Sequence, residues 1–229
     1  ISGVLKRVLV SDNEWINGVD MIRLGINGFG RVGRCIVRAL HEYHLEQEFE
    51  LVALNDLSDF ELLSHLLRYD STHGHFDAEI VLKNDCMMIN GQATQLFSSK
   101  DPAGLPWYDL QPDLVLECSG KFKQADQVSA HIQAGAPRVL ASHPVQGADA
   151  TVVYGVNHRQ LSTDQRVISN ASCTTNCLAP VAKVLQDNIG IEHGFMTTIH
   201  AYTNAQALLD KASGDYYRSR AAAQSMVPT

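Results

Sequence analysis

The sequence predicts an α/β protein in which a doubly wound, mainly parallel sheet is followed by a smaller α+β region. Three observations predict this class. Short apolar runs alternate with longer amphipathic stretches from Ile22 onward, as strands alternate with crossover helices. A glycine-rich turn joins the first run to the first amphipathic stretch. The 229 residues are 45% hydrophobic and 19% charged, which allows one large domain or two modest ones with real cores.

The first half of the chain predicts two strand–helix units and then hairpins. The strands are IRLGI and ELVALND, and each is followed by a predicted helix, VGRCIVRALHEYH and FELLSHLLRY respectively. The turn pairs N-D and N-G then interrupt the strand-like stretches AEIVLKND and CMMINGQATQLFSS. These pairs are typical of tight turns, so we expect antiparallel hairpins added to the sheet.

The parallel pattern then resumes and gives way to a second region. We expect a helix from about Gln124 to Ala134 and the strands DLVLECSG, RVLASHP, ATVVYGVN and QRVISNAS. The stretch TTNCLAPVAKVLQDNIG predicts a helix ending on Gly190, and the β-branched FMTTIHAYT predicts a strand. We therefore expect one domain at residues 21–171 and a second at 172–229, preceded by an extension of undefined role at residues 1–20.

Charge and cysteine usage disfavour several classes of protein. Eighteen Lys and Arg against 25 Asp and Glu give a formal charge of −7, which provides no basic field for nucleic acid. Five cysteines are an odd number spread through core-like segments, which differs from a secreted disulfide framework. No apolar run approaches the roughly 20 residues of a membrane span. We expect a reducing, cytoplasmic setting.

The glycine turn predicts a dinucleotide site. Gly28, Gly30 and Gly33 have the G-x-G-x-x-G spacing between a predicted strand and helix, where a helix N-terminus attracts a pyrophosphate. Asp56 ends the second strand, 23 residues after Gly33, about where a carboxylate accepts hydrogen bonds from the adenosine ribose. The alternative is a turn or capping role for Asp56. A carboxylate there repels a 2′-phosphate, so a Rossmann-type domain that prefers NAD to NADP is predicted.

The stretch SNASCTTNCLAP predicts a nucleophilic thiol. Cys173 lies between a predicted strand and helix, and a helix N-terminus stabilises a thiolate. Cys177 would lie one turn further along the helix, which suits neither a metal site without other ligands nor an easy disulfide. His200 ends the strand FMTTIH and is a candidate base, although a lone histidine at a strand end is more often structural. Together with Cys173, we interpret it as catalytic.

Several motifs together resemble one enzyme family. The stretches ING-F-GRVGR, N-D, ECSG-x-F, ATVVYGVN, SNASCTTNCLAP and TTIHAYTN occur in the order and spacing of phosphorylating glyceraldehyde-3-phosphate dehydrogenase. The resemblance runs from about Ile22 to Thr229, and SNASCTTNCLAP is shared with the related erythrose-4-phosphate dehydrogenase. It implies that Cys173 attacks an aldehyde, His200 takes the proton, NAD takes the hydride and inorganic phosphate releases the acyl group.

The resemblance also implies the remaining site residues and partners. The second region would be the catalytic domain, active on glyceraldehyde 3-phosphate in a homotetramer, with no metal. Cys177 would be a buried neighbour of the nucleophile. Ser172 and Thr174 would contact phosphate or substrate, and Thr203 would hold the substrate phosphate. The residues implied to bind NAD are Asn27, Gly28, Phe29, Gly30, Arg31, Val32, Gly33, Asp56, Ser119, Gly120 and Ser142.

The chain departs from the family pattern at three places. Ala205 stands where many bacterial members have an acidic residue, and Ser142 to Pro144 read SHP, as in the erythrose-4-phosphate branch. HAYTN resembles the glycolytic branch and lines the substrate side, so it carries more weight. The chain stops at MVPT, before the expected threonine and glycine phosphate loop. We therefore expect an incomplete catalytic domain and little activity from this chain alone.

Two other function classes explain less of the sequence. A non-catalytic NAD-binding or RNA-binding module would need the glycine turn but would not explain Cys173 with His200. A cysteine-dependent acyl transferase would have no use for Asp56. The stretch SDNEW near the N-terminus resembles one that the family carries near its C-terminus. We interpret it as coincidence, with circular permutation or a fused fragment as the alternative.

Overall fold

The computed structural model describes residues 21–224 and 226–228 and divides the chain into two compact units. The first unit ends at Ile189 and the second begins at Gly190. The expected extension at residues 1–20, with its SDNEW stretch, lies outside the described residues. Among the described residues, no helix is long and apolar enough to cross a membrane.

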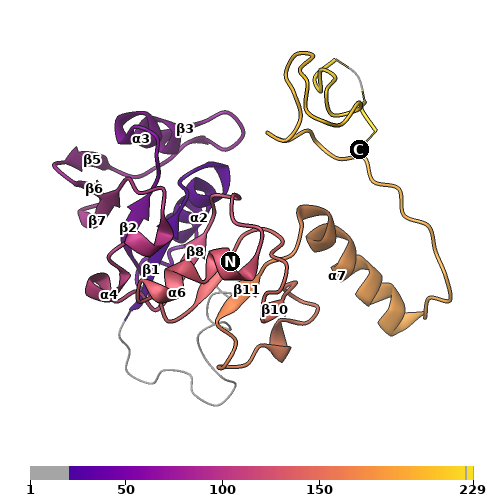
Figure 1. Cartoon of the computed structure of the whole chain (residues 1–229), viewed down its shortest axis with the longest axis horizontal. Coiled ribbons are helices and arrows are strands. Elements are labelled where there is room, and N and C mark those ends of the chain that lie inside the picture. The colour runs from indigo at the N-terminus through magenta and orange to yellow at the C-terminus, as the bar shows by residue number, and fades with distance from the viewer. Residues whose placement is uncertain (1–20, 225, 229) are drawn as a thin grey trace. The chain divides into compact units, whose positions relative to one another are not determined.

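A mixed sheet forms the first unit (Figure 1), and the described residues give it nine strands. Seven neighbouring strands are parallel, the eighth is antiparallel to the seventh, and the ninth is antiparallel to the eighth. In spatial order the strands are β10 (Ala150–Thr151), β11 (Val167–Ser169), β9 (Val139–Ala141), β8 (Leu114–Glu117), β1 (Ile22–Asn27), β2 (Phe49–Asn55), β7 (Gln92–Phe97), β6 (Cys86–Ile89) and β5 (Ile80–Lys83). This arrangement confirms the predicted parallel sheet.

Helices cover both faces of the sheet, as predicted for a doubly wound fold. Alternate residues of β8 belong to different cores, with Leu114 and Leu116 in one cluster and Val115 in the other. Residues of α2 (Arg31–Glu42) and α3 (Phe60–Arg68) join the first cluster. Residues of α4 (Trp107–Leu110) and α5 (Ala125–Val128) join the second, next to α6 (Ala130–Gln133).

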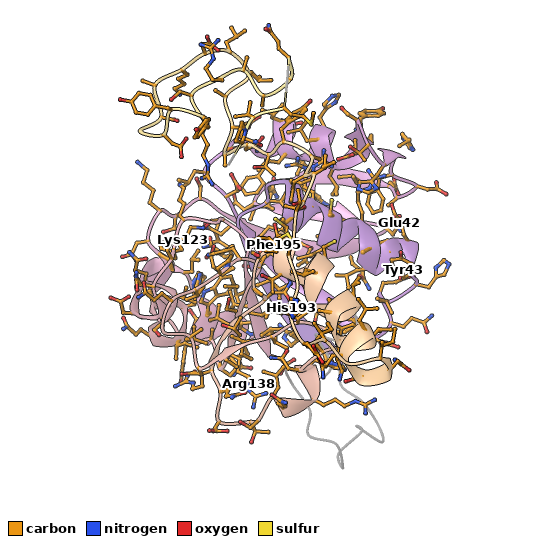
Figure 2. All side chains as sticks on the ribbon, turned by 90° about the vertical axis from the view of Figure 1, so that its right-hand side faces the viewer. Glu42, Tyr43, Lys123, Arg138, His193 and Phe195 are labelled. Carbon is orange, nitrogen blue, oxygen red and sulfur yellow. The ribbon has the colours of Figure 1, made fainter. Side chains whose placement is uncertain are left out.

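Short elements complete this unit. The ends of its surface helices are exposed, as at the C-terminus of α2, where Glu42 and Tyr43 lie together at the surface (Figure 2). The remaining elements are the strands β3 (Tyr69–Asp70) and β4 (Gly74–His75), which pair with each other, and the 3₁₀ helices η1 (Pro102–Gly104) and η2 (His158–Gln160).

The two predicted hairpins are confirmed by their turns. Asn84 and Asn90 have positive φ angles of 52° and 48°, and Gly91 has a φ of 83°. Asparagine and glycine adopt this left-handed backbone most readily, which is why these pairs predict tight turns. Strand β7 then pairs parallel with β2, so the hairpins extend the main sheet.

Several elements are shorter than predicted, and at two of them side chains form hydrogen bonds with the backbone. The expected helix from Gln124 to Ala134 is split at Ser129, whose hydroxyl donates to the Ala125 carbonyl at 2.7 Å. The expected strand ATVVYGVN is reduced to β10. The Asn157 side chain accepts from the Val153 amide at 2.8 Å and donates to the Thr151 carbonyl at 3.0 Å, so these groups bond to Asn157 instead of a neighbouring strand.

The last helix of the first unit, α7 (Cys173–Asn188), starts where the sequence predicts a helix. In the second unit, by contrast, the predicted strand FMTTIHAYT is wrong: residues 195–203 form no strand. A strand needs a neighbour for its N–H and C=O groups. Among the described residues of this unit, none pairs with this segment in a ladder.

Candidate functional site

The glycine turn between β1 and α2 needs two of its glycines for its own geometry. Gly28 has a φ of 94°, and a Cβ there would lie 2.4 Å from the Ser119 nitrogen. A Cβ on Gly33 would lie 2.4 Å from the Gly28 oxygen. At Gly30, the N-cap of α2, a Cβ would meet nothing within 4 Å. The fold therefore requires Gly28 and Gly33, whereas the open space at Gly30 suits the close approach of a ligand.

Asp56 follows β2 and is tied to the glycine turn. One oxygen, Oδ2, accepts from the Phe29 amide at 2.7 Å, and Oδ1 accepts from the Ser58 amide at 2.9 Å. The carboxylate thus has the turn-stabilising role weighed as the alternative. Its predicted contact with a ribose stays a prediction, because each carboxylate oxygen can accept more than one hydrogen bond.

A cleft of about 270 Å³ opens over the glycine turn. It lies at the carboxyl ends of β1, β2 and β8, where parallel α/β sheets bind ligands. Five of the predicted cofactor residues meet in its lining: Asn27, Gly28, Gly30, Asp56 and Ser119. The lining also contains residues outside the predicted cofactor set, among them Asn55, Ser99 and Lys121. Asn55 and Lys121 belong to the N-D and ECSG-x-F stretches, whereas Ser99 has no signal in the sequence, because only the fold places the end of β7 beside the turn.

A second cavity, of about 470 Å³, joins the start of α2 to the start of α7. Arg31 and Val32 line it from the first turn of α2, and Cys173 lines it from the first residue of α7. Ser142, another predicted cofactor residue, is also in the lining. The structure thus places the candidate nucleophile and part of the predicted cofactor set around one space. Cys118 lines both this cavity and the cleft.

A strained turn presents Cys173. Ala171 is buried and has a φ of 55°, a left-handed conformation that costs a residue with a Cβ on the order of 1 kcal/mol. The Asn176 amide holds the turn by donating to the carbonyls of Asn170 at 2.7 Å and Ser172 at 2.9 Å. Cys173 itself is exposed. Sequence reasoning missed Ala171 and Asn176, because their roles depend on backbone angles and not on residue type.

The hydroxyl residues beside Cys173 have local structural roles. The Ser172 hydroxyl caps α7 by accepting from the Thr175 amide at 3.0 Å, as serine does at many helix starts. Thr174 is the second residue of the helix and is half-buried. The predicted contacts of Ser172 and Thr174 with phosphate or substrate stay predictions.

The other cysteines differ from Cys173 in their surroundings. Burial raises the pKa of the Cys118 thiol to about 12, so this thiol stays protonated at neutral pH. Cys35 lines the same cavity as Cys173, which the sequence did not predict. The expectation that Cys177 is buried is wrong, because it is exposed on α7, none of whose described residues is buried.

Arg31 is anchored at the entrance to α2. Its guanidinium lies 2.5 Å from Asp70, which also accepts from the amides of Thr72 and His73. The hydrogen bond from Arg31 is the largest influence that lowers the pKa of Asp70 below its ordinary range. Asp70 therefore stays ionised at neutral pH, and it holds the guanidinium of Arg31, one of the predicted cofactor-binding residues, in place.

His200 and Thr203 belong to the second unit. The Nδ1 atom of His200 lies 2.6 Å from the Ala201 carbonyl oxygen, to which it donates. A neutral imidazole that donates from Nδ1 carries its lone pair on Nε2, the atom that can take a proton. The Thr203 amide donates to the Gln206 side chain at 2.8 Å. The pairing of His200 with Cys173 spans the two units and stays a prediction.

Two family models match most of the chain. The model described as "Glyceraldehyde 3-phosphate dehydrogenase, NAD binding domain" matches residues 22–125, and the one described as "Glyceraldehyde 3-phosphate dehydrogenase, C-terminal domain" matches residues 172–229. The first match covers the glycine turn and Asp56, and the second begins at the cap of α7.

Curated relatives give the same family name. Glyceraldehyde-3-phosphate dehydrogenases from Pseudomonas aeruginosa, Xanthobacter flavus and Cereibacter sphaeroides are 53%, 52% and 51% identical over 208 residues. Each alignment covers 91% of this chain and 62% of the relative. The chain therefore spans about 62% of the length of these relatives.

Proposed function

Because the chain belongs to the glyceraldehyde-3-phosphate dehydrogenase family, we propose that it oxidises glyceraldehyde 3-phosphate to 1,3-bisphosphoglycerate with NAD and inorganic phosphate. One observation carries the proposal beyond family membership. Cys173 lines the same cavity as Arg31 and Val32, which open the helix behind the glycine turn. A thiol beside a dinucleotide site is the arrangement that oxidation of a covalently held aldehyde needs.

The reaction proceeds through a thioester on Cys173. His200 takes the proton of the Cys173 thiol, and the thiolate adds to the aldehyde carbon. The protonated His200 gives the proton to the aldehyde oxygen, which forms a thiohemiacetal, and takes it again as the carbon–hydrogen bond breaks. NAD, when bound, accepts the hydride. The resulting thioester is then attacked by inorganic phosphate, which releases the acyl phosphate and returns the thiolate.

The residues of the cleft fit the cofactor. The N-terminus of α2 and the open space at Gly30 suit the pyrophosphate, because backbone N–H groups there attract an anion. Asp56 supplies the acceptor for a ribose hydroxyl. Ser119 lines this cleft, and Ser142 lines the second cavity, which also contains Cys173 in its lining. These four positions support the assignment of the cleft to NAD.

The substrate phosphates are assigned to hydroxyl residues. Ser172 and Thr174 flank the thiol at the start of α7 and contact inorganic phosphate or substrate, and Thr203 holds the substrate phosphate. The protein works in the cytoplasm as a homotetramer, as the resemblance implies. Neither the structure nor the relatives named above favour the erythrose-4-phosphate branch.

A half-reaction tests the chemistry on this chain. The purified chain is mixed with glyceraldehyde 3-phosphate and NAD without phosphate. Because little activity is expected from this chain alone, we expect slow formation of at most one NADH per chain, together with an acyl group on Cys173 in the mass spectrum. Added phosphate should remove the acyl group. Cys173→Ser should abolish both signals, whereas Cys86→Ser, in the hairpin strand β6, should leave them intact. Acylation at a different cysteine, or none with NAD bound, would contradict the proposal.

A further inference from the structure

A buried carboxylate lies under the cofactor cleft at the end of β8. Glu117 is 0% exposed, and its oxygen Oε1 accepts from the amide and the hydroxyl of Ser119 at 2.7 and 2.5 Å. Its other oxygen, Oε2, accepts from the Asn27 amide at 2.5 Å and lies 3.1 Å from Nε2 of His131. The proposed reaction does not use Glu117 or His131.

A tryptophan determines which nitrogen of His131 carries hydrogen. The Trp107 indole nitrogen lies 2.9 Å from Nδ1 of His131, and an indole N–H can only donate. Nδ1 is therefore the acceptor, and Nε2 carries the hydrogen that points to Glu117. In this arrangement His131 is a neutral donor and not a cation. Gly25 in β1 leaves room for the indole, because a Cβ there would lie 2.7 Å from the Trp107 ring.

Glu117 therefore carries a buried negative charge that is held by hydrogen bonds alone. Burial by itself would raise the pKa of Glu117, but hydrogen bonds from His131, Ser119 and Asn27 outweigh it and lower the pKa. A carboxylate with several aligned donors is stable in a dry site, whereas the loss of one donor leaves a charge partly unsatisfied.

The network continues across the ends of the neighbouring strands. The side-chain oxygen of Asn27 accepts from the side-chain amide of Asn55 at 2.7 Å. Asn55 in turn accepts from the Ser99 amide at 2.8 Å and donates to the Ser99 carbonyl at 2.9 Å. These bonds use the side-chain donors of Ser119 and Asn55 and one donor of Asn27 within the protein. The Ser119 hydroxyl oxygen accepts from the Lys121 amide at 3.2 Å, and Ser119 lines the cleft. Acceptor oxygens at these positions suit ligand hydroxyl and amino groups.

We propose that Glu117 is a positioning residue for the cofactor, which acts by orienting Ser119 and Asn27 on the floor of the cleft. The inference rests on the proposed function, because it assumes that the cleft binds NAD. Glu117 would act on the ligand only through these two residues. His131 bonds to its second oxygen, and Trp107 orients His131.

A double-mutant cycle on NAD binding tests this role in the full chain. In Glu117→Gln, the new side-chain NH₂ group faces donor groups of the neighbouring residues, and we expect NAD binding to weaken about tenfold. Ser119→Ala should also weaken binding, and in the Glu117→Gln background it should add little, because the hydroxyl has already lost its orientation. Asp77→Asn removes one exposed carboxylate elsewhere in the same unit and should leave the dissociation constant unchanged. Unchanged affinity in Glu117→Gln, or fully additive effects with Ser119→Ala, would overturn the proposal.

Two variants of His131 keep the test decisive if Glu117→Gln does not fold. His131→Gln can donate to Glu117 and accept from Trp107, so it should bind NAD within about twofold of the wild type. His131→Leu can do neither and should bind about tenfold more weakly. Equal affinities of these two variants would overturn the inference. A wild-type chain that binds no NAD would overturn the proposed function and this inference with it, whereas NAD binding that is unaffected by either position would overturn the inference alone.

Discussion

Gly28 and Gly30 occupy the same turn but meet different surroundings. The backbone at Gly28 has a positive φ and lies against Ser119, so a methyl group there has no room. Gly30 has ordinary backbone angles and open space around it, so a side chain added there would clash only with a bound ligand. A substitution at Gly28 should therefore lower stability, whereas one at Gly30 should weaken ligand binding.

We predict that Gly30→Ala weakens NAD binding at least about tenfold and leaves thermal unfolding unchanged, because the added methyl group enters the space for the pyrophosphate. Calorimetric titration and thermal unfolding measure the two quantities. Gly28→Ala is the matched contrast and should lower the unfolding temperature of the protein without ligand. Normal NAD affinity in Gly30→Ala would show that the pyrophosphate does not pass this position.

Asp56 combines a structural role with a predicted binding role, and a conservative change separates them. We predict that Asp56→Asn, which keeps an oxygen for the Phe29 amide, preserves folding but weakens NAD binding and reduces discrimination against NADP. Asp56→Ala should do the same with an added loss of stability. Direct binding of both cofactors tests this, and unchanged selectivity in Asp56→Asn would remove the carboxylate from cofactor choice.

Residue spacing predicts the chemical groups of the site but not what holds them. The glycine turn, Asp56 and Cys173 follow from local patterns, since each depends on the strand or helix next to it. Glu117 and His131 do not, because their contact joins β8 to α6 and is created only by the fold. The same holds for Asp70 opposite Arg31.

Elements were predictable where the turn or the helix carried its own signal. The hairpins of β5, β6 and β7 follow from Asn and Gly at positions of positive φ, and α7 follows from apolar residues at helical spacing before Gly190. The strand expected at residues 195–203 was wrong, because β-branched residues show only that a segment suits a strand. A strand forms only with a hydrogen-bonding neighbour, and the local pattern carries no information about that neighbour.

The Asn90–Gly91 turn gives a prediction for the hairpin. Gly91 has open space for a Cβ but a φ of 83°, so a side chain there meets strain without a clash. We predict that Gly91→Ala lowers the free energy of unfolding by about 1 kcal/mol. Urea unfolding followed by Trp107 fluorescence, in a Trp15→Phe background, measures it. Gly30→Ala, which adds the same methyl group at an ordinary φ, is the control, and equal stabilities of the two variants would contradict the argument.

At the scale of the whole molecule, the proposed chemistry depends on two units acting together. The first contains the cofactor cleft, the second cavity and Cys173, and the second contains His200 and Thr203. Cofactor binding should therefore be a property of the first unit. Activation of the thiol by a base should depend on both.

Alkylation at limiting iodoacetamide tests whether His200 serves Cys173. Cys173 is exposed at a helix N-terminus, whereas Cys118 has a raised pKa, so we predict that Cys173 is labelled first among the five thiols. His200→Ala should slow this labelling about tenfold, because an imidazole beside the thiol increases the fraction of thiolate. His193→Ala, an exposed histidine of the same unit, is the matched control and should leave the rate unchanged (Figure 2). Peptide mapping by mass spectrometry assigns each label. Faster labelling of Cys35 or Cys86 would contradict the choice of nucleophile, and equal rates in His200→Ala and His193→Ala would contradict the choice of base, so the two halves of the assignment can fail separately.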